Sequence, residues 1–420
     1  MSAFWHVAAG LAAPLIRYNL RRRVARDKEE AARLPEREGF SAARPDGRLI
    51  WLHAASVGES LSILPLIEEL AARDPALTLL VTTGTVTSAR LLPERLPEAL
   101  RGRVIHRYAP FDVPEWVARF LDGWRPDAAG FVESELWPNI LAACAARGVP
   151  LALLNARISA RSARRWGRFA PGLARRLLGR FALIMPRSAE DAARLAALGA
   201  QGMAPPGDIK LAALPLPHDP AALAALASAI GARRVFLAAS THPGEEALIL
   251  AKLPPDALTI LVPRHAHRGA EIAAIAPGPR RSEGALPDPG PLYIADTMGE
   301  LGLFYRLADV AFIGGSLVPH GGQNPLEAAR LGCPVVFGPH MGNFRDATAG
   351  LLACGGAVQV ADAAALAATV ADMLSRPGMA GAMMAAAAEW VSAASDLPGQ
   401  MAEALLSLMP PNAIGKTGEG

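Results

Sequence analysis

The chain has 420 residues, of which 51% are hydrophobic and 19% are charged, and its formal net charge is +3. A chain of this length exceeds one ordinary hydrophobic core, so we expect two folded domains and exclude a largely disordered protein. Three widely spaced cysteines without C-x-x-C pairing exclude a disulfide framework and a structural zinc site.

The N-terminal residues 1–35 predict a helix that anchors the protein to a membrane. Residues 4–16 form an apolar stretch that is interrupted by His6 and Pro14, and five arginines follow between positions 17 and 26. Crossing a bilayer takes about 20 apolar residues, so we expect this helix to lie in the interface with its arginines near anionic lipids. The alternative is a helix docked on the protein itself through Trp5 and Tyr18. The segment favours a membrane partner, and we expect no nucleic acid.

Short apolar strands then alternate with amphipathic helices in two series. The first series predicts strands at 49–53, 77–82, 128–132, 151–155 and 183–185, and the second at 234–238, 259–262, 292–295, 310–313, 334–337 and 357–360. Such alternation predicts α/β domains with parallel sheets covered on both faces, and ligands at the strand ends. Three prolines in 211–220 are typical of a linker. We therefore place domains at 36–212 and 213–409, and a disordered tail at 410–420.

Three carboxylates follow predicted strands of the first domain. Glu59 opens a helix after the small-residue loop 54–58, and Glu133 and Glu135 follow the strand that ends at 132. A carboxylate at such a strand end borders the ligand cleft, where it can act as a base or hold an acceptor hydroxyl. The alternatives are favourable helix N-terminal charge for Glu59, and solvated or arginine-paired side chains for the other two.

The stretch 157–180 is strongly basic. It contains eight arginines and no acidic residue. This pattern is typical of a solvated helical face, but it also suits an anionic partner such as phosphate, nucleic acid or a membrane surface. The residues alone leave these alternatives open.

A glycine-rich loop is the main candidate ligand site of the second domain. It follows the apolar strand at 310–313, and its four glycines between 314 and 322 let the backbone approach a ligand closely. Asn324 is expected to cap the next helix, with Pro325 at its first position and Glu327 three residues after the cap. The loop would offer backbone N–H groups and a carboxylate to a nucleotide. A capping box alone is the alternative explanation of Glu327.

Other strand ends of the second domain also carry polar groups. Ser240 and Thr241 lead into a helix start that suits a donor phosphate. Arg264 follows the strand that ends at 262 as a lone cation, and Gly299 and Glu300 lie at another loop-to-helix transition. The histidines at 265 and 267 have no neighbouring carboxylate, so we expect exposed loop histidines and no metal site.

Nine segments follow one another in a characteristic order: WLHAASVGES, VTTGTVTSAR, FVESELWPN, LNARISARSARRW, STHPGEE, VPRH, DTMGEL, FIGGSL and HGGQNPLEAA. In this order they resemble the 3-deoxy-D-manno-octulosonic acid (Kdo) transferases of lipopolysaccharide synthesis, from the N-terminal segment to Val360. The resemblance implies a GT-B fold of two Rossmann-like domains, with the acceptor in the first and CMP-Kdo in the second. It also implies a metal-independent inverting enzyme without cofactors, at the cytoplasmic face of the inner membrane of a Gram-negative bacterium.

Matching motifs imply residue roles as well. Glu59 would be the general base, and Glu133 and Lys210 would help stabilise the transition state. Contacts to CMP are implied for Pro263, Arg264, Met298, Gly299, Glu300, Leu301, Asn324, Pro325, Leu326 and Glu327. Glu135, Arg157 and Arg161 are candidates for binding the acceptor, a lipid A precursor whose phosphates suit arginine. The expected partners are thus CMP-Kdo, the lipid acceptor and inner-membrane lipids.

The sequence departs from the family pattern in two places. Asp208 and Leu211 stand near Lys210 where the family has a small hydroxyl residue and an aromatic one, and Gln323 stands where many members carry histidine. Two alternatives of other kinds remain open: a non-catalytic, membrane-associated nucleotide-sugar-binding protein, and another GT-B transferase or epimerase. Glu59 discriminates against a binding protein, which does not need a carboxylate at the cleft edge.

Overall fold

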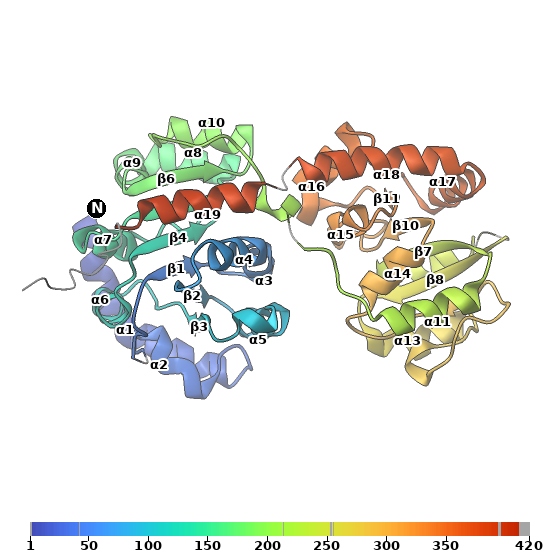
Figure 1. Ribbon diagram of the computed structural model, residues 1–420, viewed down its shortest axis with the longest axis horizontal. Helices are drawn as coiled ribbons and strands as arrows, with labels where there is room; N and C mark the ends of the chain where they lie inside the picture. Colours follow the sequence, from blue (N-terminus) through green and yellow to red (C-terminus); the bar gives the residue numbers. More distant parts are fainter. Residues whose placement is uncertain are drawn as a thin grey trace, which may run out of the picture. The chain divides into compact units, whose positions relative to one another are not determined.

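The chain forms two compact α/β units. The computed structural model describes residues 2–41, 43–212, 214–252, 254, 256–393 and 396–410. The first unit takes the described residues of Met1–Ala213 and Ala394–Gly420, and the second takes those of Leu214–Ala393 (Figure 1). Residues 411–420 of the expected tail lie outside the described part of the chain.

The sheet of the first unit has six parallel strands in the order β3-β2-β1-β4-β5-β6. They are β1 (Leu49–His53), β2 (Thr78–Thr83), β3 (Val104–Tyr108), β4 (Ala128–Val132), β5 (Leu151–Ala156) and β6 (Phe181–Pro186). The five predicted strands are confirmed. The sequence analysis missed β3, because this edge strand carries the polar His106 and Arg107 and only its two end residues are buried.

Helices cover both faces of this sheet (Figure 1). Alternate residues of β1 explain this arrangement, since Leu49 and Trp51 belong to one hydrophobic core, and Ile50 and Leu52 belong to the other. The helices are α1 (Ser2–Val24), α2 (Leu34–Arg37), α3 (Val57–Ser62), α4 (Leu64–Arg73), α5 (Val86–Arg95), α6 (Pro114–Trp124), α7 (Pro138–Ala146), α8 (Ala160–Phe169), α9 (Pro171–Leu178), α10 (Ala189–Ala197) and α19 (Leu397–Leu408).

The second unit repeats the design with six parallel strands in the order β12-β11-β10-β7-β8-β9. They are β7 (Arg234–Thr241), β8 (Ala257–Pro263), β9 (Leu292–Ile294), β10 (Val310–Ile313), β11 (Val335–Phe337) and β12 (Ala357–Gln359), which confirms all six predicted strands. Its helices are α11 (Pro220–Ile230), α12 (Glu245–Leu250), α13 (Gly269–Ile275), α14 (Leu301–Leu307), α15 (Leu326–Arg330), α16 (Arg345–Ala353), α17 (Ala363–Ser375) and α18 (Pro377–Ser392).

The last helix, α19, corrects the expected domain boundary at residue 409. The chain returns to the first unit, where α19 packs against α4 (Figure 1). Leu397, Met401 and Leu405 recur at every fourth residue, so they share one helix face, and all three are buried in the core that also contains Leu66. This apolar face finds its partner in the first unit.

We expect Leu405→Ala to destabilise the first unit by about 2–5 kcal/mol, because the side chain is fully buried and its loss leaves a cavity. Urea unfolding followed by tryptophan fluorescence measures this loss, since six of the seven tryptophans precede residue 214. Glu403→Ala is the matched control, as its side chain is 76% exposed. Equal unfolding midpoints for the two variants would contradict the assignment of α19.

The N-terminal helix α1 docks on the first unit through one side. Trp5 Nε1 donates a hydrogen bond of 2.8 Å to Asp112, and Arg17 forms an ion pair of 2.8 Å with Glu38. Leu20 is buried. The other side of the helix exposes apolar residues at every third or fourth position, namely Val7, Leu11, Leu15 and Tyr18. Among the described residues, no helix combines the length and apolar character needed to cross a membrane.

Candidate active site

The three predicted carboxylates of the first unit lie near one another at the carboxyl edge of its sheet. Glu59 follows β1, and Glu133 and Glu135 follow β4, which pairs directly with β1. The two neighbouring carboxylates both act on the pKa of Glu59, which shows that their charges lie within range of it. Parallel pairing explains the grouping, since the ends of neighbouring strands meet at one edge.

Glu59 is held by the first turn of α3. The Ser56 hydroxyl donates a hydrogen bond of 2.6 Å to Oε1, and the Ala55 amide donates one of 2.9 Å to Oε2. Ser56 Oγ in turn accepts from the Glu59 amide at 3.4 Å, which caps the first turn of α3. Burial raises the pKa of Glu59, and the negative charge of Glu133 adds to this effect, whereas the Ser56 hydrogen bond opposes it. The raised pKa suits a general base.

Glu133 is the centre of a cluster of charges. Lys210 Nζ lies 2.5 Å from its Oε1, and Arg157 Nη1 lies 3.7 Å from its Oε2. Its backbone adopts a left-handed conformation, with φ of 62°, which is uncommon for a residue other than glycine and often marks a functional site. Glu133 is therefore paired with an arginine and with a lysine, and the lysine contact brings Lys210 to the carboxyl edge.

Asp208 and Asn155 position Lys210. Asp208 Oδ1 accepts hydrogen bonds from the Lys210 amide at 3.0 Å and from the Asn155 side chain at 3.2 Å, while Asn155 Oδ1 accepts from the Ile209 amide at 3.1 Å. Burial raises the pKa of Asp208. The departure from the family pattern at Asp208 thus has a structural role, because this side chain orients the segment that carries the lysine.

Glu135 is oriented by a buried histidine. His53 Nε2 lies 3.3 Å from Glu135 Oε2, and His53 Nδ1 lies 2.9 Å from the Thr82 hydroxyl. Trp137 Nε1 also donates to the Glu135 carboxylate. Burial raises the pKa of Glu135, but the hydrogen bonds from His53 and Trp137 outweigh it, so the pKa is lowered. The lowered pKa keeps Glu135 ionised, and an ionised carboxylate can accept hydrogen bonds from hydroxyl or ammonium groups.

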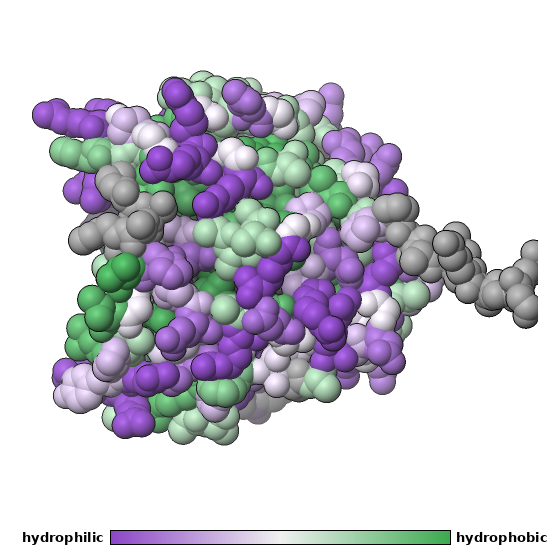
Figure 2. Space-filling view, turned by 90° about the vertical axis from the view of Figure 1, so that its left-hand side faces the viewer, coloured by the Kyte–Doolittle hydropathy of each residue, from purple (hydrophilic) through white to green (hydrophobic). Residues whose placement is uncertain are grey.

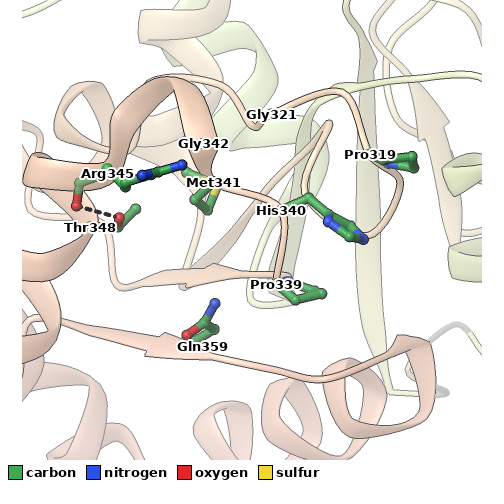
Figure 3. A pocket seen from close by; sticks show the side chains of 9 residues that line it. All are labelled: Pro319, Gly321, Pro339, His340, Met341, Gly342, Arg345, Thr348 and Gln359. Carbon is green, nitrogen blue, oxygen red and sulfur yellow. Dashed lines mark hydrogen bonds between the residues drawn. The ribbon is translucent and has the colours of Figure 1, made fainter. Parts of the chain in front are cut away.

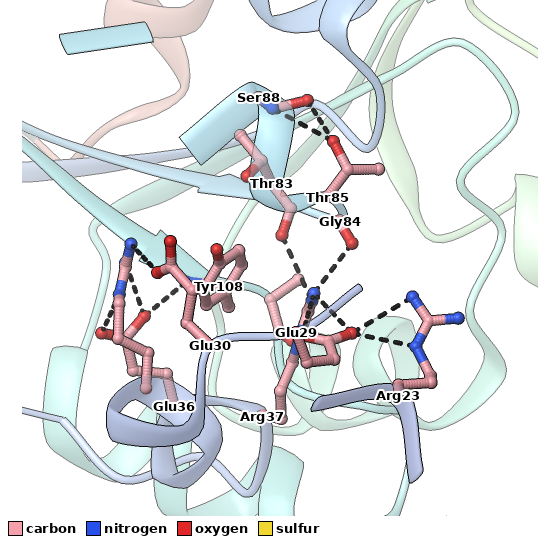
Figure 4. Close-up of polar contacts among 12 residues, drawn as sticks. Arg23, Glu29, Glu30, Glu36, Arg37, Thr83, Gly84, Thr85, Ser88 and Tyr108 are labelled. Atoms are coloured by element: carbon pink, nitrogen blue, oxygen red, sulfur yellow. Dashed lines mark hydrogen bonds and ion pairs between the residues drawn. The ribbon is translucent and has the colours of Figure 1, made fainter. Parts of the chain in front are cut away.

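A buried ion pair between Arg37 and Glu29 supports the turn after β2 at Gly84 (Figure 4). Arg37 is 4% exposed, and its Nη2 donates to Glu29 at 3.1 and 3.2 Å and to the Gly84 carbonyl at 2.8 Å. The Gly84 amide then donates to the Ala55 carbonyl at 2.9 Å. A Cβ at position 84 would lie 2.7 Å from that carbonyl oxygen, so this contact requires glycine. The segment after α1 thus supports the loop that holds the Glu59 carboxylate.

The basic stretch forms α8 and α9, directly after β5. Arg161 and Arg164 are exposed on α8, while Ala163 and Trp166 pack on the core. Arg157 is the exception in the stretch, since its charge faces Glu133. The helix therefore presents its guanidinium groups to solvent at the edge that carries the three carboxylates.

The glycine-rich loop of the second unit differs from the expectation in one important respect. The backbone amides of Gly315, Ser316 and Leu317 donate to the buried carboxylate of Glu245, at 2.6, 2.9 and 2.9 Å. The His242 amide donates to the same carboxylate at 3.0 Å. These N–H groups therefore do not face a ligand, because Glu245 occupies them and fixes the loop from inside the unit.

The expected phosphate site at Ser240 and Thr241 also needs correction. Thr241 is 1% exposed, and its hydroxyl donates to Glu246 at 3.0 Å, so it is engaged inside the unit. Ser240 has a left-handed backbone with φ of 56° at an irregularity between β7 and β8. The two residues shape the strand end, and the Thr241 hydroxyl is not presented to a phosphate.

The helix after the glycine-rich loop begins one residue later than expected. Its first residue is Leu326, and Pro325 takes the cap position. Asn324 still caps it, because its Oδ1 accepts from the Leu326 amide at 3.1 Å. Asn324 Nδ2 lies 3.3 Å from Glu327 Oε1. The contact between Asn324 and Glu327 therefore joins their side chains, whereas a capping box joins the glutamate side chain to the backbone amide of the cap residue. Both residues lie at the carboxyl edge after β10.

The remaining expected CMP contacts lie at the same edge. Pro263 ends β8, and the exposed Arg264 follows it. Met298 is 68% exposed, Gly299 has φ of 83°, and Leu301 begins α14. Glu300 pairs with Arg281 at 2.7 Å, and this hydrogen bond lowers the pKa of the glutamate. The structure therefore brings all ten residues to one edge of one sheet, at the end of β8 and in the loops and helix starts that follow β8, β9 and β10.

Four histidines of the second unit form two stacked pairs. His242 and His320 have ring centroids 4.5 Å apart, and the exposed His265 and His267 have theirs 5.6 Å apart. In the part of the chain that the structure describes, no three histidine, cysteine, aspartate or glutamate side chains are grouped as metal ligands. The positions of His265 and His267 agree with the expectation of exposed loop histidines.

Sequence reasoning missed the residues that orient others. His53 is the last residue of β1, and Glu245 stands in the segment THPGEE, which we had interpreted as a phosphate site. Arg37 is the second residue of the first predicted domain, where no motif drew attention to it. A charged or imidazole side chain at a strand end indicates that it can orient another site residue. The residue that it contacts lies far away in the sequence, so no local motif identifies the pair.

Comparisons with known proteins agree with this architecture. A family model described as 3-Deoxy-D-manno-octulosonic-acid transferase (kdotransferase) matches residues 32–213. A probable mitochondrial 3-deoxy-D-manno-octulosonic acid transferase of Arabidopsis thaliana is 37% identical, over 79% of this chain and 78% of its own. The 3-deoxy-D-manno-octulosonic acid transferase of Bordetella pertussis is 36% identical, over 85% of this chain and 86% of its own.

A solved structure shows the same fold at low identity. The UDP-GlcNAc 2-epimerase of Neisseria meningitidis matches with a TM-score of 0.56 and 12% identity, over 86% of this chain and 99% of that chain. At this identity the likeness shows the GT-B fold alone. The two transferases, by contrast, are matched over more than two thirds of their length. The chain belongs to the family of 3-deoxy-D-manno-octulosonic acid transferases, which are glycosyltransferases.

Proposed function

We propose that this protein transfers Kdo from CMP-Kdo to a sugar hydroxyl of a lipid A precursor, with inversion at the anomeric carbon and Glu59 as general base. The observation that carries the proposal is the state of Glu59, a carboxylate with a raised pKa beside two further carboxylates at the strand ends of the first unit. A protein that only bound a nucleotide sugar would not need such a base.

The chemistry is a single displacement. The acceptor hydroxyl oxygen forms a bond to the anomeric carbon of Kdo, the bond from that carbon to the CMP phosphate oxygen breaks, and the hydroxyl proton passes to Glu59. Negative charge develops on the departing phosphate, so cations that bind it there lower the barrier. Lys210 and Arg264 are the candidates, because each lies at the carboxyl edge of its own sheet.

The second unit is the proposed donor site. Asn324 and Glu327 offer an amide and a carboxylate suited to ribose hydroxyls, and Arg264 offers a cation for the phosphate. Glu245 contributes indirectly, since it takes up the loop amides and gives the glycine loop one conformation. The donor would then be bound mainly by the side chains of Asn324, Glu327 and Arg264, and less by backbone N–H groups of the glycine-rich loop.

The lipid acceptor brings the protein to a membrane surface in this proposal. The exposed face of α1 with Val7, Leu11, Leu15 and Tyr18 suits insertion among lipid head groups, and arginines follow it at the end of the helix. Hydrophobic residues also lie among hydrophilic ones on the face of the first unit shown in Figure 2. We propose that this contact occurs at the cytoplasmic face of the inner membrane.

We expect the double variant Arg161→Ala/Arg164→Ala to raise the KM for the lipid acceptor about 10-fold or more, because charge-assisted contacts to phosphate contribute about 1.5–3 kcal/mol each. The KM for CMP-Kdo should stay unchanged. Arg157 is left intact in this test, since it pairs with Glu133. Steady-state kinetics with detergent-dispersed acceptor measures both constants.

The matched control for the basic helix is Arg95→Ala/Arg101→Ala. These arginines are also exposed, but they lie at the end of α5 and before β3, at the opposite edge of the same sheet. An equal effect of the two double variants would show that general surface charge is responsible, and would contradict a specific acceptor site on α8.

The decisive experiment for the proposed function uses the purified full chain, CMP-Kdo generated in place and a tetra-acylated disaccharide precursor of lipid A. Mass spectrometry should show the precursor with added Kdo and release of CMP. Absence of any Kdo-lipid product would refute the proposal. Conversion of the donor sugar without any acceptor product would instead indicate an epimerase.

A further inference from the structure

A cavity of about 410 Å³ lies beside the glycine-rich loop of the second unit (Figure 3). Its wall includes Gly321 from that loop, His340 from the loop after β11, Arg345 from the first turn of α16 and Gln359 from the end of β12. The volume is in the range of small-molecule sites, about 300–1,000 Å³. None of the expected CMP contacts lines it, so the cavity has no assigned occupant.

The wall of the cavity is fixed by hydrogen bonds between its two loops. The Asn343 amide donates to the Gly321 carbonyl at 2.9 Å, and its side chain donates to the His320 carbonyl at 3.2 Å. The His340 amide donates to the Ser316 carbonyl at 2.9 Å. A Cβ at Gly321 would lie 2.6 Å from the Asn343 side chain, so this close approach requires glycine. The cavity is therefore a built extension of the glycine-rich loop.

The side chains around the cavity favour an anion. Arg345, His340 and Gln359 supply a cation, an imidazole and an amide, and none of the lining residues is acidic. Thr348 also lines the cavity, but its hydroxyl donates to the backbone carbonyls of Phe344 and Arg345. Across the described residues, the guanidinium group of Arg345 takes part in none of the hydrogen bonds or ion pairs. A guanidinium group can bind a carboxylate in a bidentate manner, through two parallel hydrogen bonds.

The order of the strands places this cation opposite the proposed nucleotide contacts. In the order β12-β11-β10-β7-β8-β9, Arg264 follows β8 on one side of the glycine-rich loop, and Arg345 follows β11 on the other. Since Glu245 occupies the amides of the loop itself, an anionic donor has to find its cations on the two flanks. A sugar nucleotide with an acidic sugar carries two anionic groups, the phosphate and the sugar carboxylate.

We propose that this cavity binds the acidic sugar of the donor, and that Arg345 pairs with the sugar carboxylate. The inference rests on the proposed function, which supplies a donor with an acidic sugar. It adds a specificity-determining residue: neutral hexoses attached to a nucleotide have no carboxylate, so they leave Arg345 without its partner. The nucleotide binds at the other flank of the loop and does not depend on Arg345.

The test compares the KM for CMP-Kdo with the inhibition constant of CMP for the same variants of the full chain. Arg345→Ala should raise the KM for CMP-Kdo about 10- to 100-fold, as expected for loss of a hydrogen-bonded charge. The inhibition constant of CMP should stay within about twofold of the wild-type value, because CMP lacks the sugar. Arg345→Lys should recover part of the loss, since it keeps the charge but not the planar fork.

Arg234→Ala is the matched control. This exposed arginine begins β7, at the opposite edge of the same sheet, and both constants should stay unchanged. An unchanged KM for CMP-Kdo in Arg345→Ala would overturn the inference. A parallel rise of the KM and of the CMP inhibition constant would overturn it too, because Arg345 would then bind the phosphate. Wild-type protein that transfers no Kdo at all would refute the proposed function itself, a result distinct from either.

Discussion

The Glu59→Gln variant should lose Kdo transfer by about 10²- to 10⁴-fold in kcat, which is the usual contribution of a general base. Glutamine also fits the third helical position of a capping box, so the variant should keep the hydrogen bond with Ser56 and its fold. Steady-state rates and urea unfolding measure the two properties on the same protein. Normal transfer by Glu59→Gln would remove Glu59 from the role of base.

The pH dependence of transfer should report the same carboxylate. Burial raises the pKa of Glu59 above the ordinary value of a glutamate, and a base acts only when it is ionised, so activity should fall as the pH drops through this raised pKa. The effect of Glu59 on stability depends on pH in the opposite direction to its effect on activity. Because the folded pKa is raised, the contribution of Glu59 to the free energy of unfolding is present at acid pH and is lost as the pH rises through that pKa.

Ser56→Ala provides the matched control for Glu59. It removes the hydroxyl that donates to Glu59 and so should raise the pKa of the carboxylate further, moving the acid limb of kcat/KM to higher pH. Loss of the cap should cost about 0.5–2 kcal/mol of stability, while activity at alkaline pH should remain. An acid limb that does not move in Ser56→Ala would show that another group controls the profile.

The second large effect is expected for Lys210→Met. If the lysine stabilises charge that develops in the transition state, its removal should lower kcat by about 10²- to 10³-fold, with less effect on either KM. Lys28→Met, which removes an exposed lysine of the first unit, should leave kcat unchanged. Rates at saturating donor and acceptor give the measurement.

A double-mutant cycle with Glu133→Gln separates two roles of Lys210. The lysine lies 2.5 Å from Glu133, so its loss also leaves that carboxylate with only Arg157 as a cation within 4 Å in the described part of the chain. If Lys210 only neutralises Glu133, then Lys210→Met should have no further effect once Glu133 is glutamine. A further loss of kcat in the double variant would support direct stabilisation of the leaving phosphate.

Local patterns in the sequence were sufficient for most of the secondary structure. Strands such as β1 and β10 are short apolar runs between loop residues, and the alternation with helices identifies parallel sheets. The edge strand β3 escaped because His106 and Arg107 interrupt its apolar pattern. The sequence also did not predict that α19 belongs to the first unit, because an apolar helix face does not specify which hydrophobic core it packs against.

For the candidate site, too, local sequence patterns predicted some features and missed others. Motifs in the sequence were enough to place Glu59, Glu133 and Arg264 at strand ends, since a motif depends only on neighbours in the chain. The contacts of each group became known from the folded structure. The amides of the glycine-rich loop belong to Glu245, which lies 70 or more residues away, and Lys210 meets Glu133 across 77 residues. Such pairings follow from the order of parallel strands, which no single segment encodes.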